Sequence, residues 1–249
     1  MKHIFHVHTF RCKHGSNESD EEFIKEALSL GAEKITFTEH CPFPENPFNN
    51  RMEIEQLSEY IESLKNLQIK YQGQIQIETG LEVEFLPSMI NYYKYLYELN
   101  LHPLIIGQHF FQHPDGTYSF DDKDKSDEYI GCCNAMIEGM KTGYFNIVAH
   151  PDRFFRRCKK WTQELTDISN KLIATASQYN IILEKNLSSY EKHIEKSHHI
   201  FWRKEFWNLV ELYNQTTSNP IKTIIGFDAH STEHMIKRME YIELLNQKK

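Results

Sequence analysis

Three histidines near the start of the chain have the residue type and spacing of metal ligands. His6 and His8 are separated by one residue, and His14 follows six residues after His8. Side chains alternate between the two faces of a β-strand, so a His-x-His pair on a strand points both rings to the same face. Two imidazoles on one face form a ready pair of ligands for a transition metal.

Further potential ligands recur along the chain, where short apolar segments with the character of β-strands end. Together with the first three they comprise seven histidines and two carboxylates: His6, His8, His14, His40, Glu82, His109, His150, Asp228 and His230. One zinc ion needs about three or four protein ligands, so this set indicates two or three divalent ions that share a bridging carboxylate. Nitrogen and oxygen ligands suit Zn, Mn or Fe better than Cu(I) or Ca.

An ion cluster of this kind also predicts a class of reaction. Bound divalent ions lower the pKa of a water molecule toward neutrality, and they hold the oxygens of a phosphoryl group during an in-line displacement. We therefore expect hydrolysis of a phosphate ester, with a small molecule as the substrate.

The elements that must position these ligands alternate between strands and amphipathic helices. Apolar residues at three- and four-residue steps, such as Leu57, Ile61 and Leu64, indicate helices. The sixth strand leads to Glu184, and a polar, basic, aromatic loop is expected between Glu184 and a helix that begins near residue 204. Residues 113–122 are expected to form another loop. The expected strands comprise residues 2–9, 34–38, 74–79, 103–107, 145–149, 181–183 and 222–225, and the expected helices residues 19–30, 54–71, 87–99, 125–142, 165–179, 204–213 and a last helix.

Seven successive β-then-α units predict parallel strands covered by helices. An open doubly wound sheet usually carries a Gly-rich phosphate loop, and no such loop is present in the sequence. The potential ligands follow the carboxyl ends of nearly all seven strands, and only a closed barrel brings those ends to one point. We therefore expect an α/β fold, a TIM-like (β/α)7 barrel in which residues 1–249 form a single domain.

Composition argues against several other classes of protein. The net charge of −7 disfavours a nucleic-acid partner. There is no apolar run long enough for a membrane span and no signal-peptide pattern, so a cytoplasmic location is expected. The five cysteines lack a C-x-x-C pair, which disfavours a disulfide framework or a Cys-based zinc site. Cys12 and Cys41 lie beside potential ligands, but the favoured interpretation is that both are reduced bystander thiols. Nothing in the sequence indicates the oligomeric state.

The order of the motifs resembles that of the polymerase-and-histidinol-phosphatase (PHP) family, and within it the histidinol phosphatases. The resemblance covers most of the chain. The motifs that carry it are HVHTFRCKHG at residues 6–15, TEH at 38–40, GLE at 80–82, GQHF at 107–110, AHPDR at 149–153, LEKN at 183–186 and GFDAH at 226–230.

The resemblance implies a distorted seven-stranded barrel and, as is usual in the family, a trinuclear metal centre. By position in the motifs, one metal would be held by His6, His8, Glu82 and Asp228. A second would be held by Glu82, His109 and His150, with Glu82 as the bridge, and a third by His14, His40 and His230. A metal-bridging hydroxide would attack phosphorus while the metals neutralise the phosphate oxygens.

The same resemblance implies hydrolysis of L-histidinol phosphate to L-histidinol and phosphate, a step of histidine biosynthesis. Catalytic roles are expected for Glu82, Asp228, His230 and Arg153. Arg153 suits bidentate binding of phosphate, with a surface salt bridge as the alternative. Glu184 is a candidate contact for the amino group or imidazole of histidinol, although a structural carboxylate is an equal alternative. Arg203 is a candidate second phosphate contact.

Residues 190–207 depart from the family pattern, because they lack the proline-containing segment of many histidinol phosphatases. This departure leaves another small phosphate ester, such as a nucleotide or sugar phosphate, as the alternative substrate. A tyrosine-phosphatase branch is disfavoured because its opening motif differs. A non-catalytic module, like the barrel attached to bacterial replicative polymerases, is disfavoured because all nine ligands are present.

Overall fold

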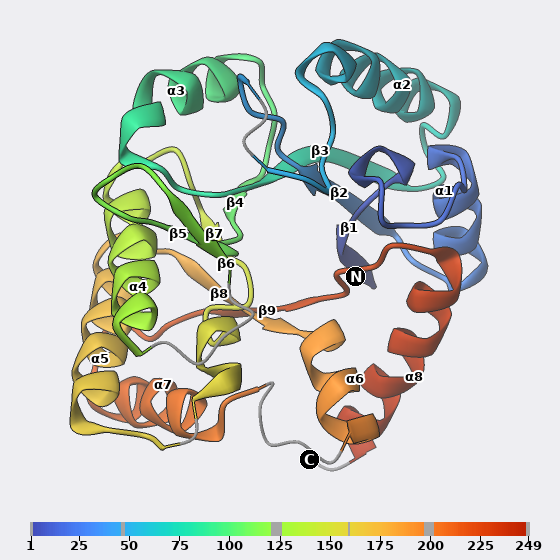
Figure 1. Ribbon diagram of the computed structural model, residues 1–249. Helices are drawn as coiled ribbons and strands as arrows, with labels where there is room; N and C mark the ends of the chain where they lie inside the picture. The colour runs from blue at the N-terminus through green and yellow to red at the C-terminus, as the bar shows by residue number, and fades with distance from the viewer. Residues whose placement is uncertain (1, 46–47, 121–125, 159, 197–201, 248–249) are drawn as a thin grey trace. The chain divides into compact units, whose positions relative to one another are not determined.

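The structure, a computed structural model, describes residues 2–45, 48–120, 126–158, 160–196 and 202–247 (Figure 1). The strands are short and mostly buried, as expected for parallel strands covered by helices. They are β1 (His3–Val7), β2 (Lys34–His40), β3 (Gln76–Val83), β4 (Leu104–Ile106), β5 (Phe110–Gln112), β6 (Tyr118–Phe120), β7 (Ile147–Val148), β8 (Ile182–Asn186) and β9 (Thr223–Gly226).

The helices begin at signals that the sequence carries. In α1 the Ser19 side chain and the Glu22 side chain each accept a hydrogen bond from the other residue's backbone N–H, which is a capping box. The helices are α1 (Asp20–Ser29), α2 (Leu57–Lys70), α3 (Ile90–Glu98), α4 (Ser126–Lys141), α5 (Gln163–Gln178), α6 (Leu187–Lys196), α7 (Lys204–Thr216) and α8 (Thr232–Gln247).

Seven of the described strands form one sheet in the order β1-β2-β3-β4-β7-β8-β9. β1 pairs with β2, β2 with β3, β4 with β7 and β7 with β8, all in parallel. The chain that follows β9 returns to β1, because Val7 bridges to Ala229 and the His8 N–H donates to the Ala229 carbonyl at 2.8 Å. The segment after β9 is therefore hydrogen-bonded to the first strand, β1. The expected seven-stranded α/β barrel is confirmed.

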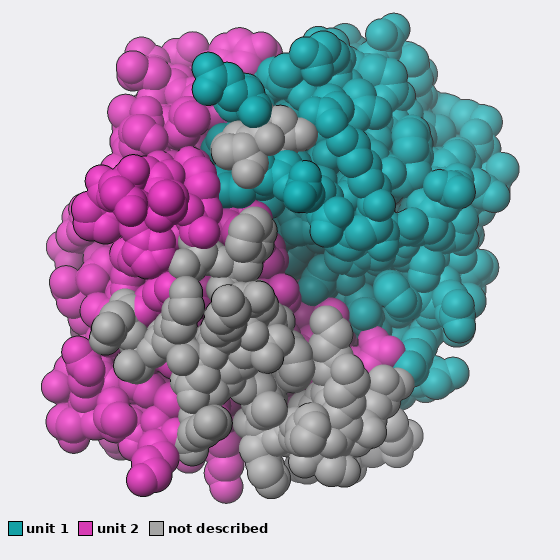
Figure 2. Space-filling view, in the orientation of Figure 1, with its two compact units in different colours: residues 1–82, 101–103, 225–249 teal, residues 83–100, 104–224 magenta. Residues whose placement is uncertain are grey.

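The chain divides into two compact units, which Figure 2 colours separately. Unit 1 comprises residues 1–82, 101–103 and 225–249, and unit 2 comprises residues 83–100 and 104–224. Helices α1 and α8 pack together in unit 1, and helices α4, α5 and α7 pack in series in unit 2 (Figure 1). The expectation of a single domain stays a prediction.

Each unit has its own aromatic packing. In unit 1, Phe23 of α1 meets Phe37 of β2 edge to face, with ring centroids 6.4 Å apart. In unit 2, Phe85, Tyr93 and Phe145 contact one another at centroid distances of 5.5–6.2 Å. These rings are buried and pack the helices against the strands. The packing holds the carboxyl ends of the strands in place.

Two elements differ from the sequence-based expectation. Of residues 113–122, expected to be a loop, residues 113–117 are the connection and residues 118–120 the second strand of the β5–β6 hairpin. Its turn is the sequence Asp115-Gly116, in which Asp115 accepts from the Thr117 N–H at 3.0 Å and Gly116 has a φ of +85°. The expected loop after Glu184 contains helix α6, and the Asn186 side chain accepts from the Ser189 N–H in its first turn. Residues 121–122 and 197–201 of the two expected loops, and residue 125 of an expected helix, lie outside the described residues.

Among the described residues, none of the helices is both long enough and apolar enough to cross a bilayer.

Candidate metal centre

The His-x-His pair lies at an irregular point of β1. His6 has a φ of +69°, and the pairing of β1 with β2 shifts register between Phe5 and Val7. His8 lies just beyond the end of the strand, and the two rings are 5.0 Å apart. Positive φ is costly for a residue with a Cβ, so this bulge is a strained feature of the kind found at functional sites. The expected convergence of the two rings is confirmed, although plain strand alternation is not its cause.

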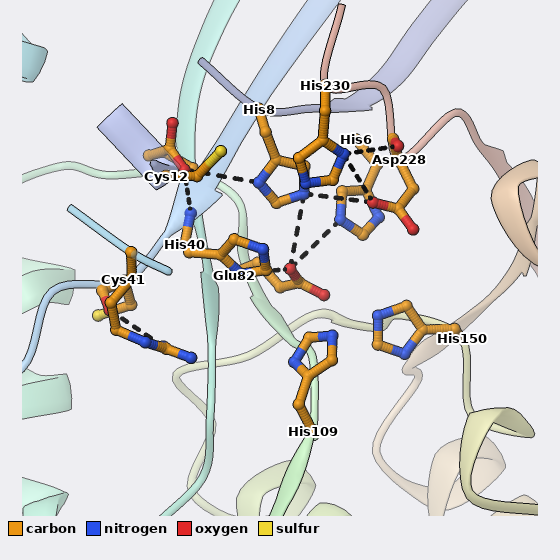
Figure 3. A network of polar contacts seen from close by, with 12 residues as sticks. His6, His8, Cys12, His40, Cys41, Glu82, His109, His150, Asp228 and His230 are labelled. Atoms are coloured by element: carbon orange, nitrogen blue, oxygen red, sulfur yellow. Dashed lines mark hydrogen bonds and ion pairs between the residues drawn. The ribbon is translucent and has the colours of Figure 1, made fainter. Parts of the chain in front are cut away.

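Glu82, near the carboxyl end of β3, faces the two histidines. Its Oε2 lies 3.6 Å from Nε2 of His6, 3.6 Å from Nε2 of His8 and 2.9 Å from Nδ1 of His40 (Figure 3). Two residues earlier, Gly80 allows β3 to lie close to the backbone of Pro103, because a Cβ at Gly80 would lie 2.2 Å from the Pro103 carbonyl oxygen. One buried carboxylate thus faces three imidazole rings.

Asp228 and His230 reach the same cluster from the segment after β9. Asp228 has a φ of +51°, and Arg238 of α8 donates to the backbone carbonyls of Phe227 and Asp228. Asp228 Oδ1 lies 3.5 Å from His8 Nε2, and the His230 ring stacks on the His8 ring at 4.2 Å. Hydrogen bonds between this segment and β1 therefore hold candidate ligands from the first and the last part of the sequence next to one another.

His14 and His40 complete the cluster of unit 1. The His14 ring lies 5.2 Å from the His40 ring and 4.5 Å from the His230 ring. Donor atoms lie within 4.8 Å of one another in three groups inside unit 1: His6, His8 and Asp228; His8, His40 and His230; and Cys12, His14 and His230. All seven predicted ligands of unit 1 therefore come together.

The sequence-based prediction missed Glu39, which is fully buried beside the ligands. It accepts hydrogen bonds from the backbone N–H groups of Thr9 and His40, at 2.7 Å each, and its Oε1 lies 3.6 Å from His8 Nδ1. A carboxylate behind a ligating histidine fixes the ring orientation and its tautomer. Its position directly before His40 in the TEH motif was the available signal.

The spacing of the donor atoms fits divalent metal ions. The separations of 3.5–3.6 Å between His8 Nε2 and the oxygens of Asp228 and Glu82 exceed the usual hydrogen-bond distance. Ligands that surround a tetrahedral zinc at about 2.0–2.2 Å lie roughly 3.3 Å from one another. His230 Nε2 is buried and makes no hydrogen bond to any described residue. These residues would therefore hold divalent ions.

The charges in the cluster are strongly coupled. Burial disfavours protonation of His8, but the nearby carboxylates of Asp228 and Glu39 outweigh it and raise the pKa of His8 to about 9. Burial alone would raise the pKa of Asp228, yet His8 and His6 hold that pKa well below its ordinary value. Burial, with His8 next, lowers the pKa of His230. An ionised Asp228 and a neutral His230 are the forms that bind a cation.

Two of the predicted histidines lie in unit 2, and the backbone N–H of each donates to a buried carboxylate. Glu84 accepts from both the backbone N–H and the Nδ1 of His109, at 2.6 Å each. Glu184 accepts from the backbone N–H of His150 at 2.8 Å. The His109 and His150 rings lie 4.8 Å apart, so two predicted ligands are neighbours in this unit. Glu84 was not among the predicted site residues.

The predicted substrate contacts lie in unit 2 in varied settings. Arg153 is half-buried at the start of a 3-10 helix (Arg153–Arg157). Its backbone N–H donates to the His150 carbonyl. Glu184 is fully buried and also accepts from Asn186. Arg203 is buried, donates to the Cys158 carbonyl at 3.0 Å and pairs with Glu205. Their roles toward a substrate stay predictions.

Comparison with known proteins places these motifs in a family. The PHP domain family matches residues 5–188. The histidinol-phosphatase of Bacillus subtilis (strain 168) is 34% identical over 154 residues, which cover 57% of this chain and 57% of that protein. The alignment thus spans little more than half the length of that curated relative.

Two solved structures share the fold. The hisK protein of Listeria monocytogenes has a TM-score of 0.72 at 17% identity, covering 94% of this chain and 97% of that one. Histidinol phosphate phosphatase (HISK) of Lactococcus lactis, a complex with zinc, L-histidinol and phosphate, has a TM-score of 0.71 at 17% identity, covering 99% and 93%. With the family match over most of its length and the ligand motifs in order, this chain belongs to the PHP domain family.

Proposed function

We propose that the protein is a metal-dependent phosphomonoesterase that hydrolyses L-histidinol phosphate to L-histidinol and phosphate. The observation that carries the proposal is the cluster of seven ligand residues in unit 1, whose donor spacing fits divalent ions. The substrate is supported by the name of the Bacillus subtilis relative and by the ligands of the Lactococcus lactis structure.

We further propose that the centre binds two or three ions of zinc, manganese or iron. His6, His8, Glu82 and Asp228 would hold one ion, and His14, His40 and His230 another, while His109 and His150 would supply ligands for a third on the family pattern. Such ions supply an activated water near neutral pH and neutralise charge on the phosphoryl oxygens.

The protein's own residues would prepare this chemistry. Glu39 orients His8, and Glu84 orients His109, so each ring presents its Nε2. Arg153 is proposed to bind the phosphate group through its guanidinium. Glu184 and Arg203 are proposed as contacts near the substrate, although the hydrogen bonds they make support the backbone of His150 and Cys158. A cytoplasmic location and the absence of a nucleic-acid partner stay predictions.

The test is phosphate release from L-histidinol phosphate by metal-loaded protein, alongside a panel of nucleotide and sugar monophosphates. We expect histidinol phosphate to be preferred by about a hundredfold in kcat/KM, which corresponds to roughly 2.7 kcal/mol. A chelated sample is the matched control and should be inactive. Preference for another ester would retain the reaction and overturn the substrate. No hydrolysis of any ester by metal-loaded protein would overturn the function.

A further inference from the structure

Cys12 lies inside the cluster of ligands and is fully buried. Its Sγ, one nitrogen of His14 and one nitrogen of His230 all lie within 4.8 Å of one another. Both histidines have a defined orientation. His14 Nδ1 donates to the Cys12 carbonyl at 2.8 Å and His230 Nδ1 donates to the Asp228 carbonyl at 3.1 Å, since a carbonyl oxygen can only accept. Each ring therefore keeps Nε2 as its available donor atom.

The hydrogen bonds of the Cys12 sulfur differ from those of other cysteines in the chain. Cys41, Cys132 and Cys158 each donate a thiol hydrogen to a backbone carbonyl, at 3.2, 3.7 and 2.7 Å. The Cys12 sulfur instead lies beside the backbone N–H groups of His14 and Gly15, while burial, with Glu39 next, raises the pKa of the Cys12 thiol to about 12, so that a bound cation would have to displace its proton.

The backbone of residues 12–15 is shaped to present this sulfur. Lys13 has a φ of +64°, which turns the following N–H groups back toward Cys12. Gly15 must lack a side chain, because a Cβ would lie 2.9 Å from the His230 carbonyl oxygen and 3.3 Å from the Cys12 sulfur. The turn thus brings Cys12, His14 and the His230 segment into close contact.

We propose that Cys12 is a thiolate ligand of the ion bound by His14 and His230, which makes this position a zinc site. On binding, the metal–sulfur bond forms, the S–H bond breaks heterolytically and the proton passes to solvent. A thiolate is a soft ligand that favours zinc over manganese or magnesium. The exposed side of His14 leaves room for a further, exchangeable ligand. The inference rests on the proposed metal centre.

The experiment is a titration of metal-depleted protein with Co²⁺, followed by absorption spectroscopy. Cobalt bound to nitrogen and oxygen ligands gives visible d–d bands, and a thiolate ligand adds a near-ultraviolet charge-transfer band. We expect both sets of bands in the wild-type protein. Cys12→Ser should lose the charge-transfer band and keep visible bands, while Cys41→Ser, a matched buried thiol, should retain both.

Competition between metals supplies a second readout. Cys12→Ser should weaken zinc binding about tenfold or more and change manganese binding much less. Thermal melting of the metal-free variants shows whether either serine replacement impairs folding. The wild-type spectrum tests the thiolate ligand even if a variant fails to fold. Visible bands without a charge-transfer band in the wild type would overturn the thiolate ligand alone. No cobalt bands of any kind would overturn the proposed metal centre as well.

Discussion

The two units hold their ligand residues in different ways. In unit 1 the ligands face one another, with Glu82 and Asp228 among three or more imidazoles, and strained backbone at His6 and Asp228 aims them. In unit 2 the histidines His109 and His150 are each fixed from behind by a buried glutamate. Unit 1 therefore places carboxylates and imidazoles face to face, whereas in unit 2 each carboxylate binds the backbone N–H of its histidine.

The largest expected effect comes from removing the shared carboxylate of unit 1. Glu82→Gln keeps the shape but removes the charge that faces three imidazoles. Turnover should fall by about a thousandfold or more, and at least one ion per chain should be lost. Elemental analysis and phosphate release on the same sample measure both. Glu78→Gln, on the same strand, is the control and should retain activity. Full metal content and activity in Glu82→Gln would contradict the shared-ligand arrangement.

The next effect concerns the loop that carries His14 in unit 1. Arg11 is buried, donates to both oxygens of Asp20 at 2.7 and 3.0 Å and to Glu59 at 2.7 Å. Arg11→Met would leave the buried Asp20 carboxylate without its guanidinium, so we expect a loss of about 3–5 kcal/mol in the free energy of unfolding.

Lys13→Met is the matched control for that prediction. Lys13 lies in the same loop and pairs with Glu53, but both side chains are more than 40% exposed. Its free energy of unfolding should change by less than about 1 kcal/mol. Denaturant unfolding measures the free energy of unfolding of both variants. An equal decrease in the two variants would show that the Arg11 network does not anchor the loop.

A smaller effect on metal binding is expected from a substitution in unit 2 that changes only how His109 is oriented. Glu84→Gln keeps a hydrogen bond to the His109 backbone but removes the charge 2.6 Å from its Nδ1. We expect metal affinity to fall about 10–100-fold while the fold is retained. Equilibrium dialysis against a metal buffer measures the change, with Glu138→Gln on α4 as an exposed control. Unchanged affinity would show that His109 needs no carboxylate behind it.

The smallest effect separates a structural histidine from the ligands. Burial, with Lys34 next, lowers the pKa of His3 to about 4, and His3 bonds Thr36 Oγ1 at 2.8 Å. The unfolded chain therefore binds this proton first as pH falls below about 6.5, so the folded state loses stability until about pH 4. His3→Asn should lessen the drop in melting temperature between pH 7 and pH 4.5 without altering metal content. An identical drop in both proteins would exclude this coupling.

Much of this arrangement could be predicted from the sequence because it depends on order along the chain. Residues that follow successive parallel strands converge in a barrel, and His40, Glu82 and His230 lie together in unit 1, while their role as metal ligands stays a prediction. The bulge at His6 could not be predicted, because a positive φ at a histidine is imposed by its neighbours and carries no sequence signal of its own.

The supporting carboxylates and helix α6 were missed for different reasons. Glu39 and Glu84 act through hydrogen bonds to residues that are either adjacent or far along the chain, and no spacing rule reveals such partners. Helix α6 follows β8 without any intervening Gly or Pro, and its polar composition favoured a loop. The cap from Asn186 to the Ser189 N–H was the available signal.

The most direct test of the account is to titrate metal-depleted protein with zinc or manganese while measuring bound metal and hydrolysis of L-histidinol phosphate together. We expect two or three ions per chain, with activity absent in the depleted protein and restored as the ions bind. Hydrolysis by the metal-free protein, or failure to retain any ion, would contradict it.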